Sequence, residues 1–396
     1  MILKDMMGYF SEYMSRHFSF EEFTIERKKW LKEITNIRKR DILVYASDYN
    51  KGSAPISIGY SDLMPFRDQL SFIKTDDIDV ILETPGGSAE SVEDMIDSIR
   101  TKFTKLGVII PGSAKSAGTI FTMAGDEILM GTNSSLGPID AQMMMNGKYF
   151  SADAFLDGLS KIKEEVLTTG KLNPAYIPIL QNISPGEIQR CENAQNFSRT
   201  LVTNWLKTYK FKYWDFRATS GQEVTDDYKQ KRAKEIADKL CKHSDWLTHG
   251  RSIRIADLEQ MKLLITNYSK NPKLAEAIDR YYTLLRMTFD MTGIYKIFET
   301  IDSQIYQSVS QAALPVIPVQ KKVKEEVSCA VTNFMCPKCS NNFNIQLNLK
   351  PNFPVEKGAI AYPRDDVFIC PNCSTQTDLA PIRFNLEAQT KLKVIK

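Results

Sequence analysis

The sequence lacks a long apolar run, a strong charge of either sign and a secretion signal. No uninterrupted apolar stretch approaches the roughly 18–20 residues that a membrane-spanning helix needs, so we expect no membrane span. The 51 basic and 48 acidic residues leave a net charge of +3, which is too small to indicate binding to nucleic acid or to an anionic membrane. The first residues show no apolar segment followed by a small-residue cleavage site. We therefore expect a cytoplasmic protein.

The composition is that of a globular protein with more than one domain. Hydrophobic residues make up 43% and charged residues 25% of the 396 residues, which is enough for a sizeable core. Strand-like and helical patterns alternate at short spacing, so we expect an α/β fold. The expected strands are 41–45, 79–83, 106–110 and 127–131, and the helices between them are 88–103 and 116–124. The predicted domains are a helical arm (1–40), an α/β domain (41–307), a linker (308–330) and a small module (331–396).

Two turns between these elements hold the residues of a serine nucleophile. Pro85-Gly86-Gly87-Ser88 follows one apolar strand, and Ser116 lies in a turn after the next strand, at the start of a helix. A nucleophilic serine needs an exposed hydroxyl and nearby amide donors for the oxyanion that develops. We expect Ser116 to be the nucleophile, with donors from the Gly86-Gly87 turn and from the Ala117 amide. In the alternative interpretation Ser116 only caps its helix.

Four of the seven cysteines predict a metal site in the C-terminal module. Cys336 and Cys339 form one Cys-x-x-Cys pair, and Cys370 and Cys373 form a second one after 30 intervening residues. Four thiolates are the tetrahedral set that a structural Zn²⁺ prefers, so we expect a zinc ribbon with Zn²⁺ as a structural cofactor. Because residues 331–396 contain 8 basic and 5 acidic residues, we do not expect this module to bind nucleic acid.

Five short motifs resemble those of a known class of serine peptidases. They are Glu83–Gly87, Ser116–Gly118, Met123–Ile128, Leu136–Asp140 and Trp246–Gly250. In this order they resemble the Clp protease proteolytic subunit (ClpP) and signal peptide peptidase class, and within it the serine dehydrogenase proteinases. The resemblance covers residues 40–300 approximately. It implies a ClpP/crotonase-like ββα superhelix with helical additions, and a serine endopeptidase that works either without ATP or with a partner.

The general base is harder to assign, because the chain has only three histidines. ClpP-type subunits carry their histidine about 25 residues after the serine, where this chain has Asp140 and no histidine. Some signal peptide peptidases use a lysine instead, about 50 residues on, and Lys171 lies 55 residues after Ser116. We expect Lys171 to be the base if apolar neighbours bury it and lower its pKa. The alternative is a triad of Ser116, His249 and Asp140, in which Asp140 orients the imidazole.

The sequence therefore predicts a serine peptidase acting on a protein or peptide substrate. We expect a homo-oligomer, with a zinc ribbon that recruits substrate or a delivery partner. Two alternatives remain: a crotonase-fold enzyme that acts on acyl thioesters without being a peptidase, and a catalytically inactive scaffold.

Overall fold

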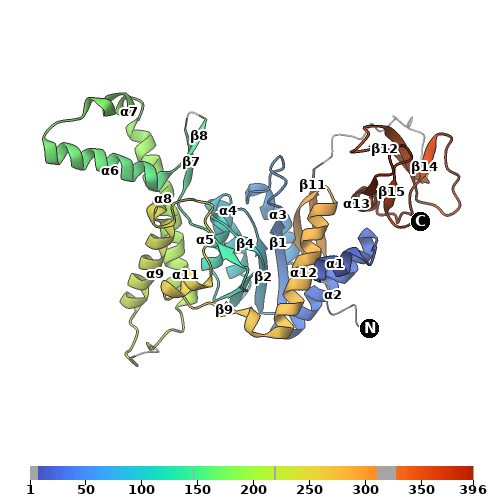
Figure 1. The fold of residues 1–396 in the computed structure, drawn as a ribbon. Coiled ribbons are helices and arrows are strands. Elements are labelled where there is room, and N and C mark those ends of the chain that lie inside the picture. The colour runs from blue at the N-terminus through green and yellow to red at the C-terminus, as the bar shows by residue number, and fades with distance from the viewer. Residues whose placement is uncertain (1–7, 146, 218–219, 310–326, 396) are drawn as a thin grey trace. The chain divides into compact units, whose positions relative to one another are not determined.

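The computed structural model describes residues 8–145, 147–217, 220–309 and 327–395 (Figure 1). These residues form two compact units. The first contains the described parts of 1–36, 276–296 and 306–396, and the second contains those of 37–275 and 297–305. The predicted domain limits at 40/41 and 307/308 stay a prediction, because these units are assembled from separate stretches of the chain. The predicted linker falls largely on 310–326, outside the described residues.

A parallel sheet forms the centre of the second unit. Its neighbouring strands are β1 (Asp41–Ser47), β2 (Asp77–Glu83), β3 (Lys105–Ile110), β5 (Glu127–Met130) and β9 (Thr266–Asn267). Beyond β1 the sheet order continues with β10 (Ile294–Glu299) and β11 (Gln304–Ser308). Almost every residue of β1, β2 and β3 is buried, as expected of parallel strands covered on both faces. The predicted α/β architecture and its four strands are confirmed.

Helices cover this sheet and connect its strands (Figure 1). They are η2 (Tyr60–Asp62), α3 (Leu63–Leu70), α4 (Ala89–Arg100), α5 (Ala117–Met123), α8 (Pro185–Trp205), η4 (Leu206–Lys210), α9 (Asp226–Cys241), α10 (His243–Trp246), α11 (Ile255–Gln260) and η5 (Tyr268–Lys270). α4 shows why they form: the Ser91 amide donates to the Ser88 hydroxyl at its start (3.0 Å), and Val92, Met95 and Ile99 are buried along one face. Two short strands, β4 (Ser113–Ala114) and β6 (Ser135–Leu136), pair beside the start of α5.

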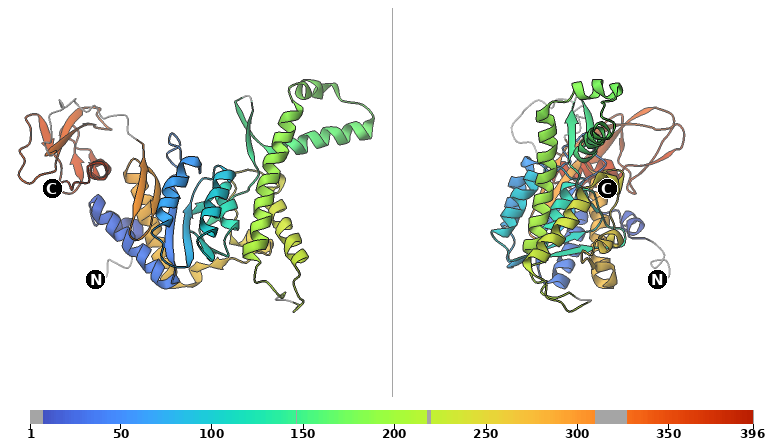
Figure 2. Two further views of the ribbon diagram at one scale, coloured as in Figure 1. Left: turned by 180° about the vertical axis from the view of Figure 1, so that it is seen from behind. Right: turned by 90° about the vertical axis from the view of Figure 1, so that its left-hand side faces the viewer.

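One part of the second unit stands out from its body (Figures 1 and 2). It consists of the antiparallel hairpin β7 (Gln142–Met145) and β8 (Lys148–Ser151), followed by α6 (Ala152–Thr169), η3 (Pro174–Tyr176) and α7 (Ile177–Gln181). Among the 18 residues of α6 only Ala152 is buried. α6 therefore contributes almost nothing to the core of the unit.

The first unit combines helices with the cysteine-containing module. Its elements are α1 (Tyr9–Met14), most of α2 (Phe20–Arg38) and α12 (Pro272–Met291), the sheet β12 (Cys329–Met335), β13 (Asn342–Asn348) and β14 (Ala359–Ala361), the pair β15 (Val367–Ile369) and β16 (Gln376–Asp378), and α13 (Ala380–Thr390). Phe384 of α13 shares a buried cluster with Phe23 and Met287. Arg383 beside it is buried and bonds Asp366 through Nε (2.9 Å). Among the described helices, none combines the length and apolarity needed to cross a membrane.

Candidate active site

The turn after β2 is shaped by two glycines. Gly86 and Gly87 have backbone φ angles of 106° and 148°, which residues other than glycine rarely adopt. The loop residue Ile58 fixes the turn, because its amide donates to the Gly86 carbonyl (2.7 Å) and its carbonyl accepts from Ser88 (2.9 Å). A Cβ atom on Gly86 would lie 2.7 Å from the Cβ of Ser116. The glycine turn and the serine turn are therefore in direct contact, as their order in the sequence predicted.

Ser116 has the backbone conformation of a residue held under strain. It precedes α5 with φ 50° and ψ −116°, which costs free energy for a residue with a Cβ atom and is found mainly at functional sites. Its side chain makes no capping hydrogen bond to α5. The interpretation of Ser116 as a simple helix cap therefore has no support in the geometry.

Two amides beside Ser116 are available to a ligand. Among the described residues, the N–H groups of Gly87 and Ala117 have no hydrogen-bond partner, whereas the Gly86 N–H donates to the Thr84 hydroxyl (3.1 Å). Ala117 is the first residue of α5, where backbone amides point out of the helix and the helix dipole favours negative charge. Of the two glycines, it is thus Gly87 that offers a free donor.

Asp140 lies at the centre of a group of hydrogen-bond donors. Its side chain is fully buried, and its Oδ1 lies 2.7 Å from Nδ1 of His249. Its Oδ2 lies 2.8 Å from Nδ1 of His243 and accepts a hydrogen bond from Nε2 of Gln142 (2.9 Å). Burial raises the pKa of this carboxyl group, but the hydrogen bond and charge of His249, together with hydrogen bonds of Ser151 and His243, outweigh burial and leave the pKa below its ordinary value. Asp140 is therefore an ionised carboxylate that can orient an imidazole.

These groups meet at a cavity of about 850 Å³. It is lined by the glycine turn and by Ser116, Ala117, Ile120, Ile139, Asp140 and His249. One face of α8 also lines the cavity with Arg190, Asn193, Ala194, Phe197 and Ser198. Ser116 and His249 line this cavity without a hydrogen bond between them, and such contacts often tighten only when substrate is bound.

Lys171 lies elsewhere in the same unit. It follows the end of α6, its side chain is exposed, and it does not line the cavity. The neighbours expected to bury it are themselves exposed, with relative exposures of 75% for Leu167, 40% for Leu172 and 41% for Ile177. The apolar surroundings needed to lower a lysine pKa are therefore missing at this position.

Lys115, next to Ser116 in the chain, points away from the cavity. Its Nζ donates to the carbonyls of Leu136 (2.9 Å) and Arg251 (3.3 Å) and to the hydroxyl of Ser252 (3.0 Å). Burial, together with the nearby Arg254 charge, lowers the pKa of Lys115 to about 8. Since Arg251 follows His249 by two residues, Lys115 ties the serine turn to the histidine segment.

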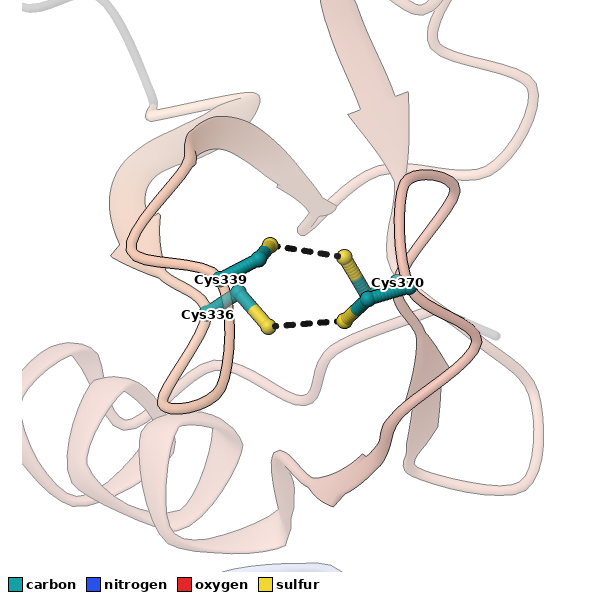
Figure 3. Close-up of side chains that lie close together, drawn as sticks. Cys336, Cys339 and Cys370 are labelled. Carbon is teal, nitrogen blue, oxygen red and sulfur yellow. Dashed lines mark hydrogen bonds between the residues drawn. The ribbon is translucent and has the colours of Figure 1, made fainter.

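The four predicted cysteine ligands come together in the first unit (Figure 3). The Sγ atoms of Cys336 and Cys373 lie 3.6 Å apart, as do those of Cys339 and Cys370. All four sulfur atoms lie within 4.8 Å of one another. A tetrahedral zinc ion with Zn–S bonds of ~2.3 Å places its sulfurs ~3.8 Å apart, so the donor set and its spacing fit such an ion. These residues can bind a metal ion.

The sequence analysis missed His243 and Gln142. His243 lies 103 residues from Asp140, and no motif surrounds it. Gln142 lies two residues after Asp140, in a stretch that matches no catalytic motif. Gln142 begins a strand whose other residues are methionines, so the sequence gives no signal that its amide bonds a carboxylate two residues away.

One part of the chain matches a known protein family. Residues 66–172 match the family of ClpP-like SDH-type serine proteinases. This confirms the resemblance to ClpP-like serine proteinases and the α/β, ClpP-like fold class. The matched segment includes Ser116 and Asp140 and ends before His249.

Two uncharacterized proteins of Methanocaldococcus jannaschii are similar in sequence. One is 29% identical over 207 residues, which are 52% of this chain and 56% of the relative, so the chain spans little more than half of that relative's length. The other is 24% identical over 262 residues, or 63% of this chain and 77% of the relative.

Two solved structures are similar to part of the chain. A mutant of the membrane-bound stomatin-specific protease 1510-N covers 56% of this chain and 79% of its own, with 14% identity and a TM-score of 0.33. ClpP1 from Listeria monocytogenes covers 60% of this chain and 97% of its own, with 11% identity and a TM-score of 0.30.

Proposed function

We propose that the chain is a serine endopeptidase whose nucleophile is Ser116. The observation that carries the proposal is the backbone of Ser116, which holds a non-glycine residue at φ 50° against Gly86 and beside two unpartnered amides. The cavity has room for several residues of an extended peptide, and it contains an oriented histidine as well. Acyl transfer requires a nucleophilic hydroxyl, a base and amide donors to the oxyanion, and all three surround this cavity.

His249 is the base in this proposal, with Asp140 as the residue that orients it. His249 lines the cavity with Ser116, and its Nδ1 donates to Asp140, which leaves Nε2 free to accept a proton. This order of triad members is the alternative that the sequence left open. Lys171 stays the competing prediction, and its exposure leaves it without the buried surroundings that a lysine base needs.

The reaction follows the usual course of acyl transfer. Ser116 Oγ attacks the peptide carbonyl while His249 takes its proton, and the carbonyl oxygen becomes an oxyanion bound by the amides of Gly87 and Ala117. The imidazolium then donates its proton to the leaving amine, and an acyl ester remains on Ser116. A water molecule attacks this ester and gives a proton to His249, which returns it to Ser116 as the acid leaves.

The zinc ribbon in this proposal recruits substrate. Cys336, Cys339, Cys370 and Cys373 would hold a Zn²⁺ ion with no coordination position left open, so the ion would stabilise the module and take no part in hydrolysis. Recruitment of a protein substrate or of a delivery partner, assembly into a homo-oligomer and a cytoplasmic location stay predictions from the sequence.

The proposal is tested by replacing the nucleophile. Ser116→Ala should abolish peptide hydrolysis while the far-ultraviolet circular dichroism and the melting temperature stay those of a folded protein. Ser98→Ala, which removes a hydroxyl on α4 outside the cavity lining, is the matched control and should keep the wild-type rate. A folded Ser116→Ala variant with the full rate would refute the assignment.

A further inference from the structure

Asp140 binds two imidazoles, and only one of them reaches the cavity. His249 Nδ1 lies 2.7 Å from Oδ1 and lines the cavity, whereas His243 Nδ1 lies 2.8 Å from Oδ2 and does not line it. The carboxylate has no exposed surface, and the two imidazoles are 27% and 29% exposed for His243 and His249, respectively. Both oxygens of one buried carboxylate are thus occupied by histidines from a single segment of the chain.

The backbone holds His243 in this position. His243 begins α10, and its amide donates to the Asp153 carboxylate near the start of α6 (2.8 Å). Six residues later in the chain, His249 contacts the other oxygen of Asp140. A carboxylate that binds one imidazole through a single oxygen can rotate about its last side-chain bond, and a donor on the second oxygen prevents this rotation.

We infer that His243 is a positioning residue that acts through Asp140. Its Nδ1–H holds Oδ2, so that Oδ1 faces His249 and keeps the proton of His249 on Nδ1. Gln142 supports the same oxygen from the β7 side (2.9 Å). This inference depends on the proposed function for its effect on rate, but not for its effect on the state of His249.

The rate test compares two substitutions at one position. His243→Leu replaces the imidazole with an apolar side chain of similar size and removes the donor. His243→Asn keeps an N–H donor near the position of Nδ1. We expect His243→Leu to lower kcat for a peptide substrate by about 10–100-fold with little change in KM, because a misplaced base slows the chemical step and not binding. His243→Asn should recover most of the rate.

A spectroscopic test does not require the protein to be a peptidase. With only three histidines in the chain, ¹⁵N-histidine NMR can resolve each imidazole. His249 should be an Nδ1–H tautomer in the wild type and in His243→Asn, and a mixture of tautomers in His243→Leu. If the wild type hydrolyses no peptide but the tautomers shift as expected, the proposed function fails and the inference stands.

Several results would overturn the inference. They are an unchanged kcat in folded His243→Leu, an equal loss in His243→Leu and His243→Asn, and a His249 tautomer that does not depend on residue 243. If His243→Leu does not fold, His243→Asn decides the question: near wild-type kcat and tautomer support the role of a donor, and a large loss of kcat excludes it.

Discussion

Gly86 lies against Ser116, so that a Cβ atom on residue 86 would come within 2.7 Å of the serine Cβ and of the Lys115 carbonyl oxygen. The contact explains the glycine by sterics and not only by its φ of 106°. It also joins the two segments that the mechanism needs, since the amide of the next residue, Gly87, is one of the two free donors.

The first prediction concerns this contact. Gly86→Ala should displace the serine turn and lower kcat/KM by about 100-fold or more, because small displacements of reacting groups are costly. Gly158→Ala in α6 is the control, since its Cβ would meet no atom within 4 Å, and it should keep full activity. Steady-state kinetics on both variants checks this. A wild-type rate for Gly86→Ala would show that the two turns do not need close contact.

The second prediction separates the two candidate bases. His249→Ala should lower kcat about as much as Ser116→Ala, by roughly 10⁴–10⁶-fold, because the members of one catalytic unit are not additive. Lys171→Ala should stay near the wild-type rate. An inactive Lys171→Ala together with an active His249→Ala would give the role to Lys171.

The strands, the turns and the cysteine ligands were predictable because their signals are local. Apolar runs, a Gly-Gly turn and two Cys-x-x-Cys pairs each fall within a few consecutive residues, and local geometry follows from them. The contacts of Asp140 were not predictable in full, because His243 and His249 lie more than 100 residues away. Apolar residues near Lys171 suggested burial, yet α6 projects from its unit and leaves them exposed (Figure 2). Periodicity shows which face of a helix is apolar but not what covers that face.

The third prediction concerns Lys115, whose pKa in the folded protein is about 8, below the ordinary 10.5. Between these two values the unfolded chain binds more protons than the folded one, so the contribution of Lys115 to stability rises as pH rises through this window. Below about pH 8 its burial costs stability in full. The free energy of unfolding of the wild type relative to Lys115→Met should therefore increase from pH 7 to pH 10. A difference that does not change with pH would contradict the lowered pKa.

The fourth prediction concerns the metal. Purified protein should contain one Zn²⁺ per chain, and Cys370→Ser should lose it, as measured by elemental analysis. Chelation should unfold the short strands around the four cysteines, because so small a sheet depends on its metal. Hydrolysis of a small activated ester should persist, since Ser116, His249 and their partners all lie in the other unit. Cleavage of a protein substrate should fall. Equal loss of both activities would mean that the metal supports the catalytic unit, and the recruiting role would be excluded.

The most direct test of the central claim is to find where a fluorophosphonate probe binds covalently. Such a probe requires a serine that is activated and an oxyanion site that accepts its oxygen. Peptide mass spectrometry should place the phosphonyl group on Ser116 in the wild type and in Ser98→Ala, and Ser116→Ala should stay unlabelled. An unlabelled but folded wild-type protein, or a label on another serine that persists in Ser116→Ala, would contradict the proposal that Ser116 is the nucleophile.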